Sequence, residues 1–315
     1  MIKQKIKIGV LVMEKKLGTK WMKKILVQLK NSGKISLVIW TNDLIQNHPI
    51  ENWPIVDGLI TLYSSGYPVN KVLSYVNRHQ PYCCNNPEFF KLMTSRESIY
   101  KVLDEIGVDH PNYLVLNTQE ITNEINEETN WISFDGKKLE KPFVEKPIGS
   151  ENHNIHIYFN SKKGGGKTKI FRKKAGRKNQ FHPNGEIRRN GIYIYEEFIE
   201  QPEPIDIKVY AIGQNYVYAE KRMSLIQEGL LQIDKYGREL REVIELSEKE
   251  REFAAKITQA FGQFICGFDI VRGKDGRSVV IDINGWSFVK SEFSNEYFQN
   301  CGKLLVELFL ANCRK

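Results

Sequence analysis

The sequence contains little that would direct the chain into a membrane or out of the cell. Apolar runs such as residues 8–13 are far shorter than the roughly 20 residues that a membrane-spanning helix needs. That run ends at Glu14, Lys15 and Lys16, so it does not form a secretory signal peptide. We therefore expect no membrane segment and a cytosolic location, and we leave a nuclear location open.

Cysteine is scarce and is not arranged as a disulfide framework or a zinc site. The five cysteines are odd in number and include no C-x-x-C pair. His153 and His156 come nearest to a metal-binding pair, but residues three apart in an extended segment point to opposite faces. We expect reduced, packed thiols and no zinc.

Two glycine motifs of nucleotide-binding proteins are also missing. No G-x-G-x-x-G follows the first apolar run, which argues against dinucleotide binding there. The segment 166–168 resembles the end of a P-loop, but Ser161 stands where that motif needs glycine. We interpret the glycine run 164–166 as a flexible flap over a triphosphate, with a plain exposed hairpin as the alternative.

The chain carries an excess of positive charge. It has 46 Lys plus Arg against 38 Asp plus Glu, a net charge of +8, which favours an anionic partner. Cations such as Arg172, Lys208 and Lys290 stand in or beside apolar strands, and the only dense basic run lacks interleaved aromatic residues. This placement indicates a lined pocket for a phosphorylated small molecule, and no nucleic acid is expected.

The first part of the chain alternates apolar strands with amphipathic helices. With 315 residues, the chain is long enough for two domains. The alternation predicts a small Rossmann-like α/β domain over residues 1–92. Its expected strands are 6–13, 35–40 and 56–62, and its expected helices are 19–30 and 69–78.

The second domain, residues 93–315, is predicted to be richer in strands. A helix is expected from its Ser95 cap to Gly107, and the polar, acidic stretch 117–128 is expected to be a surface loop. Further helices are expected over 247–262 and 302–312. Strands are expected at 143–146, 154–159, 169–171, 192–198, 205–212, 216–221, 267–271 and 279–283.

A pair of strands near the C-terminus carries oxygen ligands. An Asp-Gly turn joins segments 267–272 and 280–285, which predicts a hairpin. The hairpin puts Asp269 and Asp282 on neighbouring strands, and Asp282 and Asn284 on one face. Three oxygen-bearing side chains then converge as Mg²⁺ requires, although ordinary strand polarity is the alternative.

Two further segments suit a nucleotide. Lys146 ends an apolar strand, where an ammonium can pair with phosphates, although an exposed lysine is equally consistent with the pattern. The segment 195–199 resembles a linker that passes an adenine, so that backbone groups of Glu197 and Ile199 pair with the base and a carboxylate holds the ribose.

Taken in order, these segments resemble the kinase domain of the diphosphoinositol pentakisphosphate kinases, which has an ATP-grasp fold. The resemblance covers nearly the whole chain. It implies an N-terminal Rossmann-like domain followed by an ATP-grasp domain of two α+β subdomains that enclose the nucleotide. The matching motifs are Met13-Glu-Lys-Lys16, Pro142-Phe-Val-Glu-Lys-Pro147, His153-Asn154, Phe171-Arg-Lys173, Tyr193-Ile-Tyr-Glu-Glu-Phe198, Asp206-Ile-Lys-Val-Tyr210, Cys266-Gly-Phe-Asp269 and Asp282-Ile-Asn-Gly-Trp-Ser-Phe-Val-Lys290.

The resemblance also implies the site residues. Two Mg²⁺ ions would be bound by Asp269, Asp282 and Asn284, and the catalytic residues would be Lys208, Arg172 and Asp282. ATP would be held by Arg96, Lys146, His153, Arg172, Glu196, Glu197, Phe198, Ile199, Asp206 and Lys208. The inositol phosphate would be held by Lys15, Lys16, Arg172, Lys173, Lys208, Arg222, Arg241, Ser287 and Lys290.

The implied reaction is magnesium-dependent transfer of the ATP γ-phosphate to a phosphate of inositol hexakisphosphate or its 5-diphosphate derivative, at position 1. A phosphate acceptor is already ionised near neutral pH, so no general base is needed. Larger family members carry a phosphatase-like domain after the kinase, so opposing hydrolase activity would come from elsewhere. Met223 and Leu225 depart from the family pattern beside the expected substrate entrance, so substrate capture is expected to differ.

Three alternatives remain at this point. The chain could phosphorylate a free hydroxyl of an inositol phosphate, it could be a carboxylate-amine ligase of the same fold, or it could be an inositol polyphosphate sensor with weak catalysis. Intact Asp269, Asp282 and Asn284 argue against lost catalysis. The oligomeric state is not indicated by the sequence.

Overall fold

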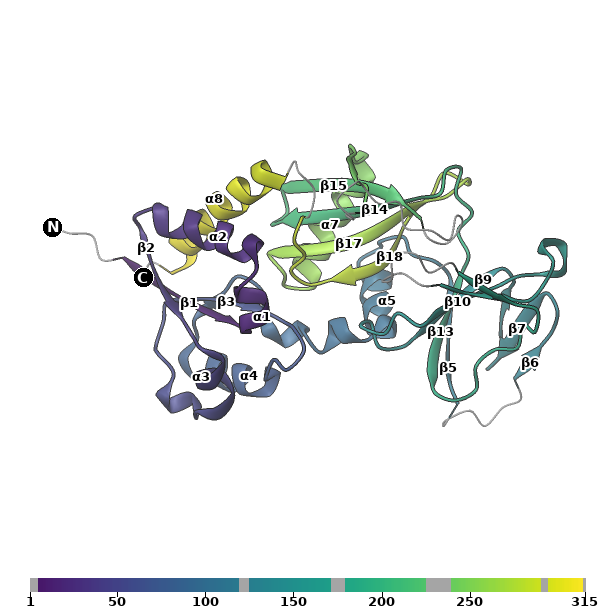
Figure 1. The fold of residues 1–315 in the computed structure, drawn as a ribbon, viewed down its shortest axis with the longest axis horizontal. Coiled ribbons are helices and arrows are strands. Elements are labelled where there is room, and N and C mark those ends of the chain that lie inside the picture. Colours follow the sequence, from purple (N-terminus) through teal and green to yellow (C-terminus); the bar gives the residue numbers. More distant parts are fainter. Residues whose placement is uncertain (1–4, 119–124, 171–178, 225–238, 290–293, 314–315) are drawn as a thin grey trace.

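A computed structural model describes residues 5–118, 125–170, 179–224, 239–289 and 294–313. Three layers of sheet and helix follow one another along the long axis of the molecule (Figure 1). The N-terminal sheet stands at one end, the sheet built from β14, β15, β17 and β18 lies in the middle, and the sheet that contains β9, β10 and β13 lies at the other end.

The N-terminal sheet has four parallel strands in the order β2-β1-β3-β4. The expected strands and helices of this region are all present. Thr19 caps α2, because its side chain accepts a hydrogen bond from the Met22 N–H. The bounds are β1 Ile6–Val12, α1 Glu14–Leu17, α2 Lys20–Asn31, β2 Ile35–Ile39, α3 Asn42–Asn47, β3 Gly58–Leu62, α4 Val69–His79 and β4 Tyr82–Cys83.

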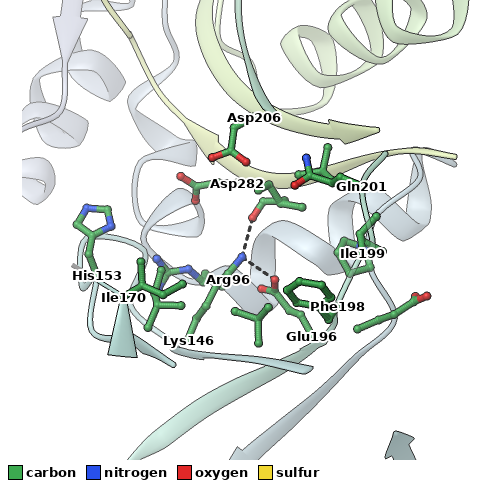
Figure 2. Close-up of a pocket in the computed structure, with 16 residues that line it drawn as sticks. Arg96, Lys146, His153, Ile170, Glu196, Phe198, Ile199, Gln201, Asp206 and Asp282 are labelled. Carbon is green, nitrogen blue, oxygen red and sulfur yellow. Dashed lines mark hydrogen bonds and ion pairs between the residues drawn. The ribbon is translucent and has the colours of Figure 1, made fainter. Parts of the chain in front are cut away.

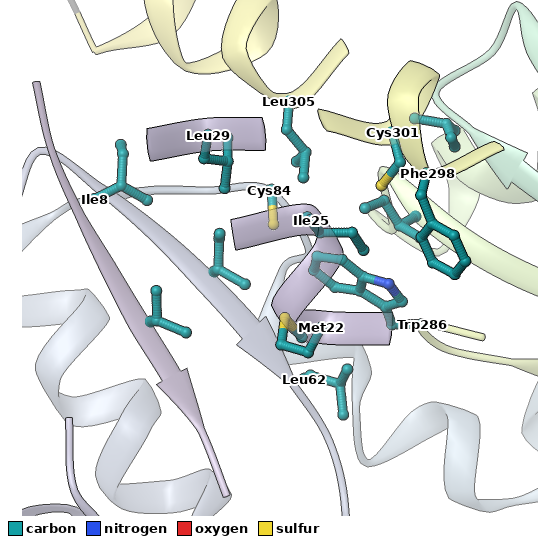
Figure 3. Close-up of a cluster of buried hydrophobic side chains, with 14 of the residues drawn as sticks. Ile8, Met22, Ile25, Leu29, Leu62, Cys84, Trp286, Phe298, Cys301 and Leu305 are labelled. Atoms are coloured by element: carbon teal, nitrogen blue, oxygen red, sulfur yellow. The ribbon is translucent and has the colours of Figure 1, made fainter. Parts of the chain in front are cut away.

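The last helix of the chain, α8 (Ser294–Asn312), packs on this first sheet. Figure 3 shows Phe298 and Leu305 of α8 facing Met22 and Leu29 of α2 in one apolar cluster. The helix begins eight residues before the predicted start at Gly302. A Cβ atom on Gly302 would lie 2.3 Å from the Gln28 Cβ, so this glycine permits the close approach of two helices and does not mark a helix end.

The middle sheet is antiparallel and has the strand order β16-β15-β14-β17-β18. Helix α7 packs against it, and the helix starts at Ser247 with a complete capping box to Glu250. The expected strands and both expected helices are confirmed. The bounds are α5 Arg96–Glu105, β14 Ile205–Ile212, β15 Tyr216–Met223, β16 Glu242–Val243, α7 Glu248–Ala260, β17 Ile265–Arg272 and β18 Ser278–Asn284.

The third sheet has the order β12-β11-β10-β9-β13-β5, and a small sheet of β6, β7 and β8 stands beside it. The sequence did not predict β5, which pairs with β13 as the edge strand. Of the predicted surface loop 117–128, residues 119–124 lie outside the described residues and Asn126–Glu127 forms β6. The bounds are β5 Tyr113–Asn117, β7 Trp131–Phe134, β8 Lys137–Glu140, β9 Phe143–Pro147, β10 Ile155–Tyr158, β11 Lys167–Ile170, β12 Gln180–His182 and β13 Ile192–Glu197.

Candidate active site

A cavity lies between the middle sheet and the third sheet. Many of its lining residues were predicted from the sequence (Figure 2). The predicted ones are Arg96, Lys146, His153, Glu196, Glu197, Phe198, Ile199, Asp206 and Asp282. The residues that the sequence did not indicate are Pro111, Val144, Ile155, Ile170, Gln201, Val271 and Ile281.

Most of these additional residues are apolar. Val144 stands two residues before Lys146 on β9, so both side chains project from one face of the strand. The alternation of side chains along this strand could therefore have indicated Val144 from the sequence. Ile155 and Ile170 face each other across β10 and β11, a pairing that no local pattern indicates. Figure 2 shows Phe198 and Ile199 at one end of the cavity and Ile170 beside Arg96 and His153 at the other. Apolar walls of this kind suit a flat organic ring.

Lys146 joins the two sheets that form the cavity. Its Nζ lies 2.5 Å from Glu196 Oε2 on the neighbouring strand β13, and it donates to the Ile281 carbonyl on β18 at 3.1 Å. Glu196 is 2% exposed and Lys146 is 7% exposed. The ammonium therefore has a fixed position in the cavity wall, as expected for a cation that meets a phosphate.

Arg96 is held in the same wall by the loop after β9. Its guanidinium donates to the carbonyls of Pro147, Gly149 and Ser150 at 2.5, 2.6 and 3.0 Å. These bonds fix the loop that leads from Lys146 to His153. Arg96 therefore fixes the loop after β9, in addition to its predicted contact with ATP.

The linker after β13 runs past one end of the cavity. The Glu197 N–H donates to the Asn112 carbonyl, so a base would have to use the Glu197 carbonyl in place of this N–H. The Glu197 carboxylate accepts from Arg277 Nη2 at 2.7 Å and from Asn112 Nδ2 at 2.9 Å. Arg277 was missed because it stands in the β17–β18 turn, far from the linker in sequence.

The predicted hairpin of acidic residues is confirmed in its geometry. Asp269 and Asp282 are directly paired across β17 and β18, and Asn284 Nδ2 donates to Asp282 Oδ2 at 3.1 Å. Asp269 is 3% exposed, and its Oδ1 lies 3.3 Å from Lys208 Nζ and 3.2 Å from Arg222 Nη2. No three His, Cys, Asp or Glu side chains of the described residues form a metal cluster, so a cation here would depend on two carboxylates and an amide oxygen. Such hard oxygen donors fit Mg²⁺.

A second, larger cavity adjoins the first. His153 lines both cavities, Asp282 lines the first and Asn284 lines the second, so the two spaces meet at the acidic hairpin. The predicted substrate residues that line the second cavity are Lys16, Lys208, Arg222, Arg241 and Ser287. Arg172, Lys173 and Lys290 lie outside the described residues.

Lys15 lines neither of these two cavities, and its predicted contact with the substrate stays a prediction. It is exposed in the short helix α1, where neighbouring residues point about 100° apart, so the Lys16 side chain reaches the second cavity and the Lys15 side chain does not. The prediction treated the pair as equivalent because it came from a motif and not from the helix geometry.

Arg241 is held rigidly although the cavity is open. It is bonded to Glu220 Oε2 at 3.2 Å and to the Tyr210 hydroxyl at 2.9 Å, and Glu220 is fully buried. Burial acts to lower the pKa of Arg241, but Tyr210, Glu239 and Glu220 outweigh it, so the pKa lies above its ordinary value. Its positive charge is therefore permanent.

The second cavity also has aromatic walls that the sequence did not indicate. Trp21 of α2 lines it and stacks on Phe298 of α8, with ring centroids 5.4 Å apart. Trp286 and Phe288 follow Asn284 and complete this wall. Tyr63 and Phe90 add two more rings from the N-terminal part.

The glycine turn 164–166 does not cover the nucleotide cavity, so the predicted flap is wrong. In the β10–β11 hairpin, the end at Ile155 and Ile170 lines that cavity, and the glycine turn is at the opposite end. The turn instead lines a separate cavity with Glu127 and Lys141. The sequence predicted the hairpin but could not tell which of its ends faces the site.

No helix among the described residues is long and apolar enough to cross a membrane.

Comparison with known proteins identifies relatives along nearly the whole chain. Residues 6–94 match the family of the diphosphoinositol pentakisphosphate kinase 2 N-terminal domain, and residues 168–300 match the RimK-like ATP-grasp domain. The inositol hexakisphosphate and diphosphoinositol-pentakisphosphate kinase 2 of Mus musculus is 37% identical over 310 residues, which are 98% of this chain and 27% of that protein. The corresponding kinase of Saccharomyces cerevisiae is 36% identical over an alignment of 333 positions, which covers 98% of this chain and 29% of the relative.

The chain therefore spans little more than a quarter of the length of these relatives. Among solved structures, the D-alanine–D-alanine ligase of Bacillus anthracis complexed with ATP has a TM-score of 0.61 at 15% identity, with 98% of each chain covered. The ATP-grasp ligase PsnB has a TM-score of 0.56 at 14% identity, with 99% of this chain and all of that chain covered. The chain has the mixed α/β ATP-grasp fold, and over 98% of its length it is similar to the inositol hexakisphosphate and diphosphoinositol-pentakisphosphate kinases.

Proposed function

We propose that this chain is an ATP-dependent inositol pyrophosphate kinase. It transfers the γ-phosphate of ATP to a phosphate of inositol hexakisphosphate or of its 5-diphosphate derivative, at position 1 of the ring. The observation that carries this proposal is the meeting of two chemically different cavities at Asp282 and Asn284. One cavity has apolar walls and suits a nucleotide, and the other has four cations in its wall and suits a polyanion.

In this proposal ATP occupies the first cavity. Its base lies beside Phe198 and Ile199, and its phosphates lie toward Lys146 and His153. Asp269, Asp282 and Asn284 would hold the two Mg²⁺ ions, which neutralise charge on the transferred phosphoryl group. The fixed position of Lys146 supports this arrangement, because an ammonium that is already oriented loses little freedom when it binds a phosphate.

The acceptor occupies the second cavity in this proposal. Lys16 lies in α1, Arg222 in β15 and Arg241 just before β16, so cations from the N-terminal part and from the middle sheet line one cavity. Lys208 lines the second cavity, and its Nζ lies 3.3 Å from Asp269 Oδ1, which supports its proposed role as a cation beside the two reacting phosphates. The barrier is mainly repulsion between two anions, and cations that are held in advance reduce it. The proposed set also includes Lys15, Arg172, Lys173, Ser287 and Lys290.

We further propose that residues 1–92 are a Rossmann-like domain and that residues 93–315 are the ATP-grasp domain. The parallel order β2-β1-β3-β4 supports the first assignment. Because α8 packs on the N-terminal sheet, the proposed second domain contributes a helix to the core of the first. The proposed location is the cytosol.

Phosphorus NMR tests the proposed reaction directly. The chain is incubated with Mg²⁺, ATP and inositol hexakisphosphate, and the expected product shows a new β-phosphate signal together with ADP. An ester product from an acceptor with a free hydroxyl would instead favour the hydroxyl-phosphorylating alternative. Formation of ADP and free phosphate alone would contradict the proposal. The variant Asp43→Asn, at an exposed carboxylate that lines neither cavity, serves as the control.

A further inference from the structure

Gln201 is a buried amide in the wall of the first cavity. It stands in the segment between β13 and β14, two residues after Ile199, and it is 5% exposed. A polar side chain that is buried beside apolar walls costs free energy unless its hydrogen-bonding groups are matched. The hydrogen-bonding groups of this amide must therefore find partners within the protein or in a molecule that occupies the cavity.

The orientation of the amide is fixed by one bond within the protein. The Gln201 side chain donates from Nε2 to the carbonyl of Ile205. Because a carbonyl can only accept, the nitrogen must face Ile205 and the oxygen must lie on the other side of the amide group. Gln201 is thus a fixed hydrogen-bond acceptor in the cavity wall.

The position of this acceptor matches one part of a nucleotide. Figure 2 shows Gln201 between Ile199 on one side and Asp206 and Asp282 on the other. In the proposed arrangement the base lies at the Ile199 end and the phosphates lie toward Asp282. The sugar joins base and phosphates, so it passes the wall at Gln201, and its hydroxyl groups are hydrogen-bond donors.

We propose that Gln201 Oε1 accepts a hydrogen bond from a ribose hydroxyl and makes the cavity selective for ribonucleotides over deoxyribonucleotides. This inference rests on the proposed function, because it needs a nucleotide in the first cavity. One hydrogen bond between neutral groups corresponds to a preference of about 3- to 10-fold in Kd. Gln201 is then a specificity-determining residue for the nucleotide.

Binding of three nucleotides to the full chain tests this. The Kd values of ATP, 2′-deoxy-ATP and 3′-deoxy-ATP are measured by calorimetry for the unaltered protein, for Gln201→Leu and for the exposed control Gln259→Leu. We expect the unaltered protein and the control to bind ATP about 3- to 10-fold more tightly than one of the deoxynucleotides. In Gln201→Leu the ratio of the Kd of that deoxynucleotide to the Kd of ATP falls to about 1. The same ratio for the other deoxynucleotide is unchanged, as expected when one specific hydrogen bond is lost.

Equal affinities of the unaltered protein for all three nucleotides would overturn the inference, as would a Gln201→Leu variant that keeps the original ratio. Melting temperatures show whether the variant is folded. If it is not, Gln201→Asn withdraws the oxygen by one methylene and must also lower the ratio. Failure of ATP to bind at all would overturn the proposed function as well. ATP binding and phosphoryl transfer without sugar preference would overturn only the role of Gln201.

Discussion

Lys146 donates a hydrogen bond to the carbonyl of Ile281, the residue that a β-bulge removes from the register of β17 and β18. Asp269 pairs with Asp282 and Ile270 pairs with Val280, so Ile281 has no partner across the pair. The bulge turns this carbonyl toward the neighbouring sheet. One irregular residue thus connects the lysine on β9 to the strand that carries Asp282.

Lys146→Met should destabilise the fold as well as weaken ATP binding. Removal of one partner from a buried ion pair leaves Glu196 uncompensated, which costs about 3–5 kcal/mol. The double variant Lys146→Met with Glu196→Gln should recover much of the stability and still bind ATP weakly. Urea unfolding and nucleotide titration separate the two effects. The exposed pair of Lys138 and Glu140 is the control, and Lys138→Met should change stability by less than about 1 kcal/mol.

Asp282→Ala should abolish phosphoryl transfer and spare binding of the inositol phosphate. Asp282 lines the nucleotide cavity, and the cations of the second cavity remain in place. Loss of a preorganised charge at the reacting group reduces the rate by at least about 100-fold. Product formation and calorimetry with inositol hexakisphosphate measure the two quantities, with Asp43→Asn as the control. Unchanged turnover would refute the proposed metal-binding role of Asp282.

The sequence predicted those parts of the site that depend on local pattern. The Asp-Gly turn was enough to place Asp269 and Asp282 on neighbouring strands. The register that continues from the turn would set Asp269 opposite Ile281, and the bulge, which the sequence did not indicate, brings it opposite Asp282. Gln201 and Arg277 were missed, because their places in the site depend on how distant segments are brought together in the fold. Edge strand β5 was missed for the same reason, since its pairing with β13 joins segments about 80 residues apart.

The positions of Lys15 and of the glycine turn 164–166 relative to the cavities were not predicted for another reason. In both cases the residues form the expected local structure, but the face or the end that meets the cavity is set by tertiary packing. A turn of about 100° between neighbours on α1 separates Lys15 from Lys16. The β10–β11 hairpin has two ends, and only the three-dimensional arrangement shows that the end at Ile155 is near the site.

Glu145→Gln should lower stability most at neutral pH. Burial acts to raise the pKa of Glu145, but hydrogen bonds from His156, Arg188 and Tyr195 outweigh it and hold the pKa below its ordinary value of 4.5. A carboxylate whose pKa is lowered by folding stabilises the protein above its unfolded pKa, and this contribution is lost as the pH falls through the folded pKa.

The difference in unfolding free energy between Glu145→Gln and the unaltered protein should therefore be several kcal/mol at pH 7, of the order found for broken buried pairs. It should shrink progressively below about pH 4.5. Urea unfolding at a series of pH values measures it. The exposed Glu140→Gln is the control and should show little difference at any pH. A destabilisation that does not vary with pH would indicate lost packing in place of lost charge.

The cysteines should react slowly with thiol reagents while the protein is folded. Burial raises the pKa of Cys84 and of Cys266 to about 12, and Cys301 is also fully buried with a raised pKa. Because the thiolate is the reactive form, alkylation of Cys84 and Cys266 at pH 8 should be at least about 1000-fold slower than alkylation of a free thiol. Alkylation of Cys301 should also be slow. Iodoacetamide labelling followed by mass spectrometry measures each site.

The partly exposed Cys83 and Cys313 serve as internal comparison and should be labelled first, although burial raises their pKa too. Rapid labelling of Cys301 in the native protein would mean that α8 detaches readily from the N-terminal sheet.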